Sequence, residues 1–159
     1  MIPVHGDRAH PEQLRAGTEE DLYEITRIDA EAFPSDPYPY FVVRQFFDLS
    51  GGRLLVLDDS HTLHGYVLAT PPDAGLSWIL SLGVPRDLRG RGLGRRLMVE
   101  MVSRLRAEGA REIKLTVDPD NDPAVLLYRH LGFLAVGDLL KDYFGPGEHR
   151  IRMALDLCR

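Results

Sequence analysis

The chain has 159 residues, of which 44% are hydrophobic and 27% are charged, so its composition is that of a globular protein and excludes a disordered or fibrous chain. The formal charge of −5 argues against general nucleic-acid binding, and no apolar run approaches the roughly 20 residues of a bilayer span. The one cysteine, Cys158, excludes a disulfide or a cysteine metal site within one chain. We therefore expect a cytoplasmic protein with no metal and with no membrane or nucleic-acid partner, and no apolar stripe in the sequence decides between a monomer and a homodimer.

Residues 1–17 are polar, contain two prolines and show no hydrophobic periodicity, which predicts a flexible arm ahead of a single domain over residues 18–159. Thr18 opens a Thr-Glu-Glu-Asp segment with the acidic first turn typical of a helix start, and apolar residues follow it at helical spacing. The first helix is therefore predicted over residues 18–33.

The proline-rich segment at residues 33–40 cannot continue this helix, because each proline restricts the residue before it and removes a backbone donor. A short second helix is predicted over residues 41–47, and a Gly-Gly pair ends it. Two β-rich runs at residues 53–57 and 63–70 are joined by a turn, which predicts an antiparallel hairpin. Residues 77–84 follow as a strand with both faces partly covered.

The second half of the chain alternates helical and extended patterns. A helix is predicted over residues 93–108, where apolar residues form one stripe, and a strand over residues 112–117. An Asp N-cap, a proline at the first helical position and a terminal glycine predict a helix over residues 122–131. Two strands near residues 134–140 and 150–157 complete the order αα-ββ-β-α-β-α-ββ, which is an α/β fold class.

A glycine-rich turn connects the strand at residues 77–84 to the next helix. Its sequence is Arg-Gly-Arg-Gly-Leu-Gly over residues 89–94. Glycines let backbone amides approach a ligand, and a helix start adds free N–H groups and the positive end of its dipole, so this turn is suited to bind phosphate. Five arginines near the turn add positive charge, namely Arg86, Arg89, Arg91, Arg95 and Arg96.

Two nucleotide-binding motifs fit this turn less well. A Walker loop needs Gly-Lys followed by Ser or Thr, whereas two arginines follow Gly94. A dinucleotide-binding fold needs Gly-x-Gly-x-x-Gly, whereas the glycines here are spaced two apart. Asp118 does end the next strand, where a ribose-binding acid would lie, but too little sequence follows to build the repeated half of that fold.

A second motif lies further along the chain. Residues 121–133 have the sequence Asn-Asp-Pro-Ala-Val-Leu-Leu-Tyr-Arg-His-Leu-Gly-Phe. Together with the Arg-x-x-Gly-x-Gly run at residues 89–94, this segment resembles the GNAT superfamily of N-acetyltransferases, in which the glycine loop grips the pyrophosphate of coenzyme A. Residues 81–84 and 142–147 resemble the protein N-terminal acetyltransferases, including the RimI-like enzymes. The resemblance implies a mixed, mostly antiparallel sheet of about six to seven strands with helices on both faces.

The same resemblance implies that the cosubstrate is acetyl-coenzyme A. A splayed strand end near Val84 would hold the pantetheine arm and polarise the thioester carbonyl. The glycine-rich turn would hold the pyrophosphate, and the second motif would complete the site. The residues that it assigns to cofactor binding are Leu82, Gly83, Val84, Arg89, Gly90, Arg91, Gly92, Leu93, Gly94, Arg95, Asn121, Ala124 and Tyr128.

The catalytic residues that the resemblance implies are Tyr128 and Thr116. Tyr128 occupies the position of the family's general acid, which donates a proton or a hydrogen bond to the departing thiolate. Thr116 occupies the position where many relatives have a glutamate or histidine base, and a hydroxyl could only position a water there. Asp118, Asp36 and His64 are further candidates for the base, and the sequence does not rank them.

A weak base favours an acceptor that loses its proton easily. An N-terminal α-amine has a pKa of about 7.7 to 8 and a lysine about 10.4, so deprotonating lysine takes roughly 3 to 4 kcal/mol more near neutrality. We therefore predict acetylation of a protein or peptide N-terminus by direct attack in a ternary complex. A small amine, a lysine side chain or a non-catalytic acetyl-coenzyme A sensor remain alternatives. The residues expected at the acceptor slot are Phe33, Tyr38, Tyr40, Ser81 and Tyr143.

Overall fold

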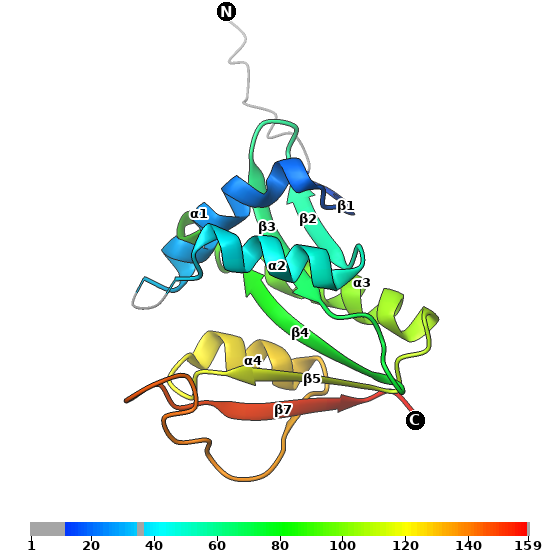
Figure 1. The fold of residues 1–159 in the computed structure, drawn as a ribbon, viewed down its shortest axis with the longest axis vertical. Coiled ribbons are helices and arrows are strands. Elements are labelled where there is room, and N and C mark those ends of the chain that lie inside the picture. The colour runs from blue at the N-terminus through cyan, green and yellow to red at the C-terminus, as the bar shows by residue number, and fades with distance from the viewer. Residues whose placement is uncertain (1–11, 35–36, 159) are drawn as a thin grey trace, which may run out of the picture.

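A computed structural model of the chain describes residues 12–34 and 37–158 (Figure 1). This part of the chain forms one sheet of seven strands in the order β1-β2-β3-β4-β5-β7-β6, in which every pairing is antiparallel except that of β4 with β5. The strands are β1 (Gln13–Ala16), β2 (Leu54–Asp58), β3 (Leu63–Ala69), β4 (Leu76–Gly83), β5 (Glu112–Val117), β6 (Leu134–Ala135) and β7 (Ile151–Asp156). The helices are α1 (Leu22–Ala32), α2 (Tyr40–Ser50), α3 (Leu93–Ala107) and α4 (Asp122–His130), with short 3-10 turns η1 (Glu19–Asp21) and η2 (Arg86–Leu88). The mixed, mostly antiparallel sheet is confirmed.

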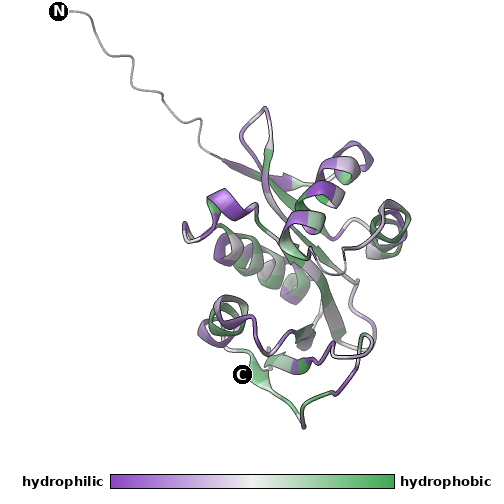
Figure 2. Cartoon of the chain, turned by 90° about the vertical axis from the view of Figure 1, so that its left-hand side faces the viewer, coloured by the Kyte–Doolittle hydropathy of each residue, from purple (hydrophilic) through white to green (hydrophobic). Residues whose placement is uncertain are grey.

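The helices cover both faces of the sheet, as expected, and each face has its own apolar core (Figure 2). On one face, α1 buries Leu22, Ile25 and Ile28 completely beside α2. On the other face, α3 buries Leu97 and Met101, and α4 packs next to it. Strand β2 supplies both cores, because its successive side chains point to opposite faces. None of the described helices is long and apolar enough to cross a bilayer.

The structure corrects the prediction for the N-terminal segment. Residues 1–11 of the predicted arm lie outside the described residues, but Gln13–Ala16 forms the edge strand β1. This strand pairs with β2 from Gln13↔Asp58 to Ala16↔Leu55. Four residues are too few to show a clear alternation, and their partner lies far along the chain, so no local pattern predicted this strand.

Two further details near the C-terminus differ from the prediction. The strand expected over residues 134–140 is only two residues long, because Gly137 has a left-handed φ of +75° and breaks the extended backbone. An isolated bridge between Leu140 and Arg150 resumes the pairing. The N-cap of α4 is Asn121 instead of Asp122, since the Asn121 side chain accepts the N–H of Ala124 at 3.3 Å.

The central feature of the sheet is a separation between β4 and β5. Their parallel pairing covers only the first residues, from Leu76↔Glu112 to Trp78↔Lys114, although both strands continue beyond it. Figure 1 shows the two strands diverging after this start. A β-bulge lies at the same place, because Ile79 and Ser81 pair with consecutive residues of β3 and leave Leu80 between them. The sheet therefore opens into a gap flanked by backbone groups of β4.

Gly83 leaves room for the buried ring of Tyr66, so we predict that any side chain at position 83 destabilises the folded protein. It lies opposite Tyr66 of β3, and an added Cβ would lie 2.5 Å from Cε1 of that ring and 3.3 Å from Cγ2 of Ile28. Gly83→Ala should therefore lower the free energy of unfolding in urea by about 1–3 kcal/mol. Gly94→Ala is the control, because its Cβ would lie 3.5 Å from the nearest atom. Equal stability of the two variants would show that the ring has room to move.

Candidate active site

The N-terminus of α3 presents a row of free backbone donors. The N–H groups of residues 92–95 donate no hydrogen bond to any other described residue. Gly90 and Gly92 have left-handed φ angles of +80° and +77°, and a Cβ on either would meet nothing within 4 Å. Open space beside unpaired amides at a helix start is the geometry that holds an anion such as a phosphate.

Side chains around this turn add charge or fix its shape. Arg89, Arg91 and Arg95 are exposed around it. The Nε of Arg89 donates to the carbonyl oxygen of Val84 at 3.2 Å, which ties the turn to the end of β4. Leu93 is 7% exposed and packs in the core, so only its backbone amide is available. The groups that can hold an anionic cofactor are therefore the amides and the arginine guanidinium groups.

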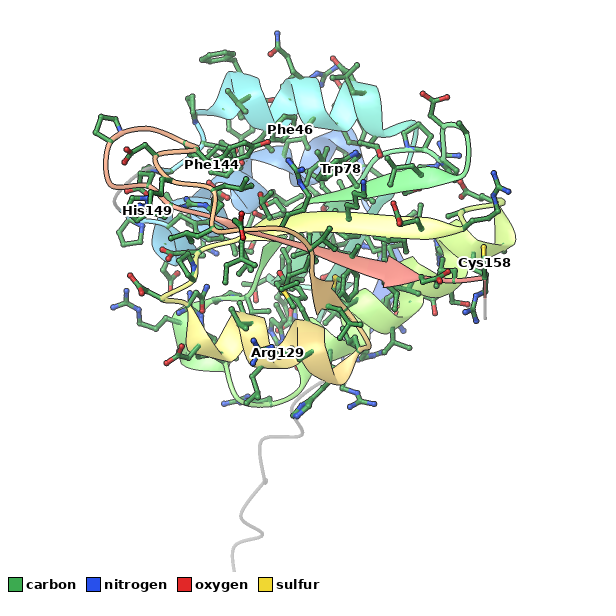
Figure 3. All side chains as sticks on the ribbon, turned by 90° about the horizontal axis from the view of Figure 1, so that it is seen from below. Phe46, Trp78, Arg129, Phe144, His149 and Cys158 are labelled. Atoms are coloured by element: carbon green, nitrogen blue, oxygen red, sulfur yellow. The ribbon has the colours of Figure 1, made fainter. Side chains whose placement is uncertain are left out.

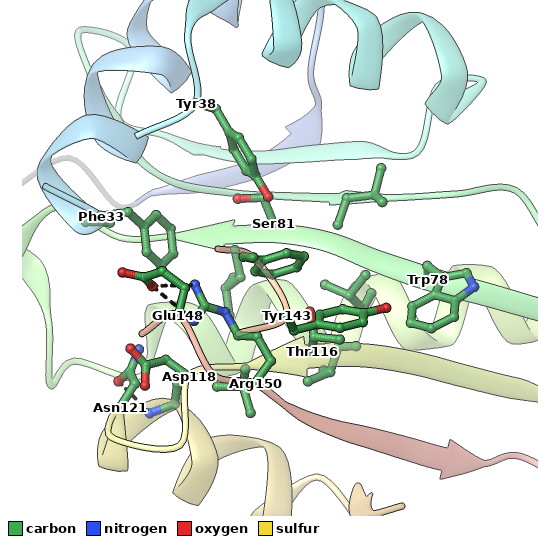
Figure 4. Close-up of a pocket in the computed structure, with 18 of the residues that line it drawn as sticks. Phe33, Tyr38, Trp78, Ser81, Thr116, Asp118, Asn121, Tyr143, Glu148 and Arg150 are labelled. Carbon is green, nitrogen blue, oxygen red and sulfur yellow. Dashed lines mark hydrogen bonds and ion pairs between the residues drawn. The ribbon is translucent and has the colours of Figure 1, made fainter. Parts of the chain in front are cut away.

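The turn adjoins a cleft of about 800 Å³ that lies between β4 and β5 (Figure 4). A Cβ on Gly94 would lie 3.9 Å from Cδ2 of Leu82, which lines the cleft, so the helix start and the cleft are neighbours. Gly83, Val84 and the glycine-rich turn itself lie outside the lining. The predicted site residues that line the cleft are Phe33, Tyr38, Ser81, Leu82, Thr116, Asn121, Ala124, Tyr128 and Tyr143.

Tyr128 reaches the cleft from α4. It is 8% exposed, and its ring packs against that of Phe133 with centroids 5.9 Å apart. Its hydroxyl has no hydrogen-bond partner among the described residues, and burial raises the pKa of this phenol to about 12. The hydroxyl thus stays protonated at neutral pH and can donate to a ligand in the cleft.

One of the three candidates for a base lines the cleft, as does Thr116. Thr116 of β5 lines it, and so does Asp118, whose Oδ1 accepts a backbone N–H two residues further on at 2.9 Å. His64 is not among the lining residues, and its ring nitrogens each lie 2.9 Å from a carboxylate oxygen. Asp36 lies outside the described residues. Within the described ranges, no group of three or more His, Cys, Asp or Glu residues is placed to hold a metal.

Three of the residues predicted for the acceptor lie on two loops that line the cleft, and a fourth, Ser81, lines it from β4. Phe33 and Tyr38 come from the segment between α1 and α2, and Tyr143 from the segment before β7 (Figure 4). Tyr40 was also expected here, but it lies outside the lining, and its ring stacks on Tyr23 with centroids 4.3 Å apart. Tyr40 is the first residue of α2, and its ring thus packs on a residue of α1 while it is absent from the lining of the cleft.

Several lining residues were not predicted from the sequence. Trp78 stands at the last paired position of β4, and Lys114 Nζ lies 6.0 Å from the centroid of its ring. Figure 3 shows Trp78 with Phe46 and Phe144 beneath α2. Two further lining residues, Glu148 and Arg150, form an ion pair at 3.2 Å. The one sequence signal for this group was a lone tryptophan in a central strand.

Comparison with known proteins identifies the family. Residues 19–133, more than half of the chain, match the family model described as acetyltransferase (GNAT) family. The chain belongs to this family. The resemblance expected from the glycine-rich turn and the Asn121 motif is thereby confirmed.

Three similar proteins illustrate the range within this family. A mycothiol acetyltransferase from Actinosynnema mirum is 31% identical over 74% of this chain, but the chain covers only 41% of that protein. An N-alpha-acetyltransferase from Sulfolobus acidocaldarius is 29% identical, with 91% of this chain and 92% of that protein covered. The crystal structure of Ard1 from Thermoplasma volcanium shares the fold with a TM-score of 0.86 and 20% identity, and the match covers 94% of this chain and 99% of that one.

Burial of Tyr128 predicts a loss of stability in alkali. An unfolded chain ionises its tyrosines at a pKa of about 10, whereas burial raises the pKa of Tyr128 to about 12 in the folded protein. Stability from the neutral phenol is complete below pH 10 and is lost as the pH rises through 12, because only the unfolded chain ionises in that window. Between pH 8 and pH 11 the wild type should lose about 1 kcal/mol more than Tyr128→Phe in urea unfolding. A parallel loss in both proteins would contradict the raised pKa.

Proposed function

We propose that this protein is an acetyl-coenzyme A-dependent N-acetyltransferase whose acceptor is the N-terminal α-amine of a protein or peptide. The observation that supports it best is the row of free amides at the start of α3, directly beside a cleft that contains the unpartnered hydroxyl of Tyr128. Unpaired donors at a helix start can be satisfied by a bound anion as well as by water, and the open space beside Gly90 and Gly92 gives an anion access to them. In a member of an acetyltransferase family, a pyrophosphate-containing acetyl donor fits this place.

In this proposal, acetyl-coenzyme A supplies an activated acetyl thioester when it is bound. The amides of residues 92–95 and the exposed guanidinium groups of Arg91 and Arg95 hold its pyrophosphate. Leu82, Asn121 and Ala124 line the route from there into the cleft. The free edge of β4 beyond Trp78 offers backbone N–H and C=O groups to the remainder of the cosubstrate, because β5 no longer pairs with it.

The reaction that we propose is a direct transfer with both substrates bound. The amine lone pair forms the new C–N bond as the C–S bond breaks. Tyr128 donates a hydrogen bond to the departing sulfur, and its high pKa keeps that proton available throughout the neutral range. Thr116 positions a water that receives the proton of the amine, since a threonine hydroxyl is no base itself.

The choice of an α-amine rests on the modest basicity of this cleft. Its lining contains no histidine among the described residues, and of its carboxylates Asp118 accepts a backbone N–H while Glu148 pairs with Arg150. An α-amine needs least help to lose its proton near neutrality. The relative named N-alpha-acetyltransferase, which the chain matches over nearly all of its length, agrees with this choice.

A small-molecule amine is the second candidate acceptor. The mycothiol acetyltransferase relatives favour it, although this chain spans less than half of their length. Two loops on either side of an open cleft suit a peptide as well as a compact amine.

An acceptor panel tests the proposed function. Release of thiol from acetyl-coenzyme A is measured with peptides that have a free α-amine, with N-blocked peptides that contain lysine, and with small amines. We expect the highest kcat/KM for free N-termini, and a Tyr128→Phe variant that loses roughly 100-fold in kcat with little change in the KM for acetyl-coenzyme A. Tight cofactor binding without turnover of any amine would instead identify a sensor, and full activity of Tyr128→Phe would remove its hydroxyl from the mechanism.

A charge-only change at Gly92 tests the pyrophosphate site. Asn and Asp both tolerate the left-handed backbone at this position, and the side chain would project into open space. Gly92→Asp should raise the KM for acetyl-coenzyme A by about 10-fold or more relative to Gly92→Asn, because its carboxylate repels the pyrophosphate. The difference should shrink at high salt. Equal KM values for the two variants would place the pyrophosphate elsewhere.

A further inference from the structure

A buried polar chain leads from the helical layer to the cleft. Asp29 is fully buried on α1, at helical spacing from the buried residues Ile25 and Ile28. Its Oδ1 accepts the hydroxyl of Tyr66 at 3.1 Å, and that hydroxyl lies 2.7 Å from Oγ of Ser81. Ser81 lines the cleft on β4, just after the bulge. The three residues form a continuous path from a buried carboxylate to the acceptor slot.

The second carboxylate oxygen of Asp29 is also occupied. Oδ2 accepts the backbone N–H of Tyr38 at 2.8 Å, and Tyr38 itself lines the cleft. Burial raises the pKa of Asp29, while the hydrogen bonds that it accepts from the Tyr38 N–H and the Tyr66 hydroxyl act in the opposite direction. Because each oxygen already accepts a hydrogen bond, the carboxylate form fits this site. The buried carboxylate of Asp29 thus fixes both Tyr38, which lines the cleft, and the hydrogen-bonded chain through Tyr66.

A carboxylate at one end fixes the direction of the whole chain. A carboxylate can only accept, so the single proton of the Tyr66 hydroxyl points to Asp29. The Tyr66 oxygen then accepts the proton of Ser81, its other neighbour. Since a hydroxyl has one proton, Ser81 has none left for the cleft and offers only lone pairs there. The chain therefore makes Ser81 a hydrogen-bond acceptor for whatever lies in the slot.

We propose that Ser81 is the docking point for the amino group of the acceptor, and that Asp29, acting through Tyr66, is the positioning residue that gives Ser81 its accepting polarity. This inference rests on the proposed function and specifies its acceptor: a group with N–H donors, such as an ammonium or amine, that binds beside Tyr38. A Ser81 hydroxyl that donated its proton into the cleft would disfavour such a group. The carboxylate of Asp29 is separated from the cleft by Tyr66 and Ser81. It therefore makes the Ser81 oxygen a hydrogen-bond acceptor without placing a full charge in contact with the substrate.

Three variants test the proposal on the full chain with the peptide acceptor used above. Ser81→Ala removes the accepting oxygen, and Asp29→Asn keeps the shape and the Tyr38 contact but can donate to Tyr66 and so reverse the chain. Both should raise the KM for the amine roughly 10- to 100-fold and leave the KM for acetyl-coenzyme A unchanged. Ser77→Ala, which removes a buried hydroxyl without a partner in the described chain, is the matched control and should change neither value.

Tyr66→Phe provides a second test if Asp29→Asn lowers stability. It breaks the chain but leaves the carboxylate and Ser81 in place, so the Ser81 hydroxyl rotates freely and the KM for the amine should rise less than in Ser81→Ala. An unchanged KM for the amine in Ser81→Ala, or an equal rise for both substrates in all variants, would overturn the proposal. A wild-type protein that acetylates no amine would instead overturn the proposed function, so the two failures are distinguishable.

Discussion

The structure depends on strand β4, which is hydrogen-bonded to its neighbour along one edge and is largely unpaired along the other. β4 pairs with β3 over most of its length but with β5 over three residues only. Backbone groups that leave a sheet cost free energy unless water or a ligand satisfies them, so a gap in the middle of a seven-stranded sheet is a feature that must be maintained by its surroundings. The core on the α3 face holds the two sides of the gap together, because it contains Val67 of β3 and Ile79 of β4 as well as Ile113 of β5.

The glycine-rich turn continues the same strand into the proposed cofactor site. Positive φ angles at Gly90 and Gly92 turn the chain sharply from the end of β4 into α3, and they leave the amides of the first helical turn exposed. The Arg89 bond to Val84 fastens the turn to the strand. The β4 wall of the cleft and the glycine-rich turn therefore belong to one continuous segment of the chain. A change in the packing of β4 would move both of them.

Local patterns were sufficient to predict most elements and the cofactor turn, because helix caps, glycines and alternation act over a few residues. They could not predict β1, whose pairing partner is distant in the sequence, or the outward stacking of Tyr40, which depends on Tyr23 of another helix. The hydrogen-bonded chain of Asp29, Tyr66 and Ser81 could not be predicted from the sequence for the same reason. Its carboxylate, phenol and hydroxyl come from α1, β3 and β4, and only tertiary packing brings them together.

Gly83 shows how tightly the two halves of the site are coupled. Its missing side chain admits the ring of Tyr66, and the ring in turn carries the hydroxyl that joins Asp29 to Ser81. The sequence resemblance assigns Gly83 to the backbone that would hold the cofactor, and the structure shows a packing constraint at the same residue. A Cβ at Gly83 would meet the ring of Tyr66, whereas a Cβ at Gly92 would meet nothing within 4 Å. The two glycines thus differ in what the missing side chain provides, because Gly92 leaves open space beside the turn and Gly83 leaves space for a ring.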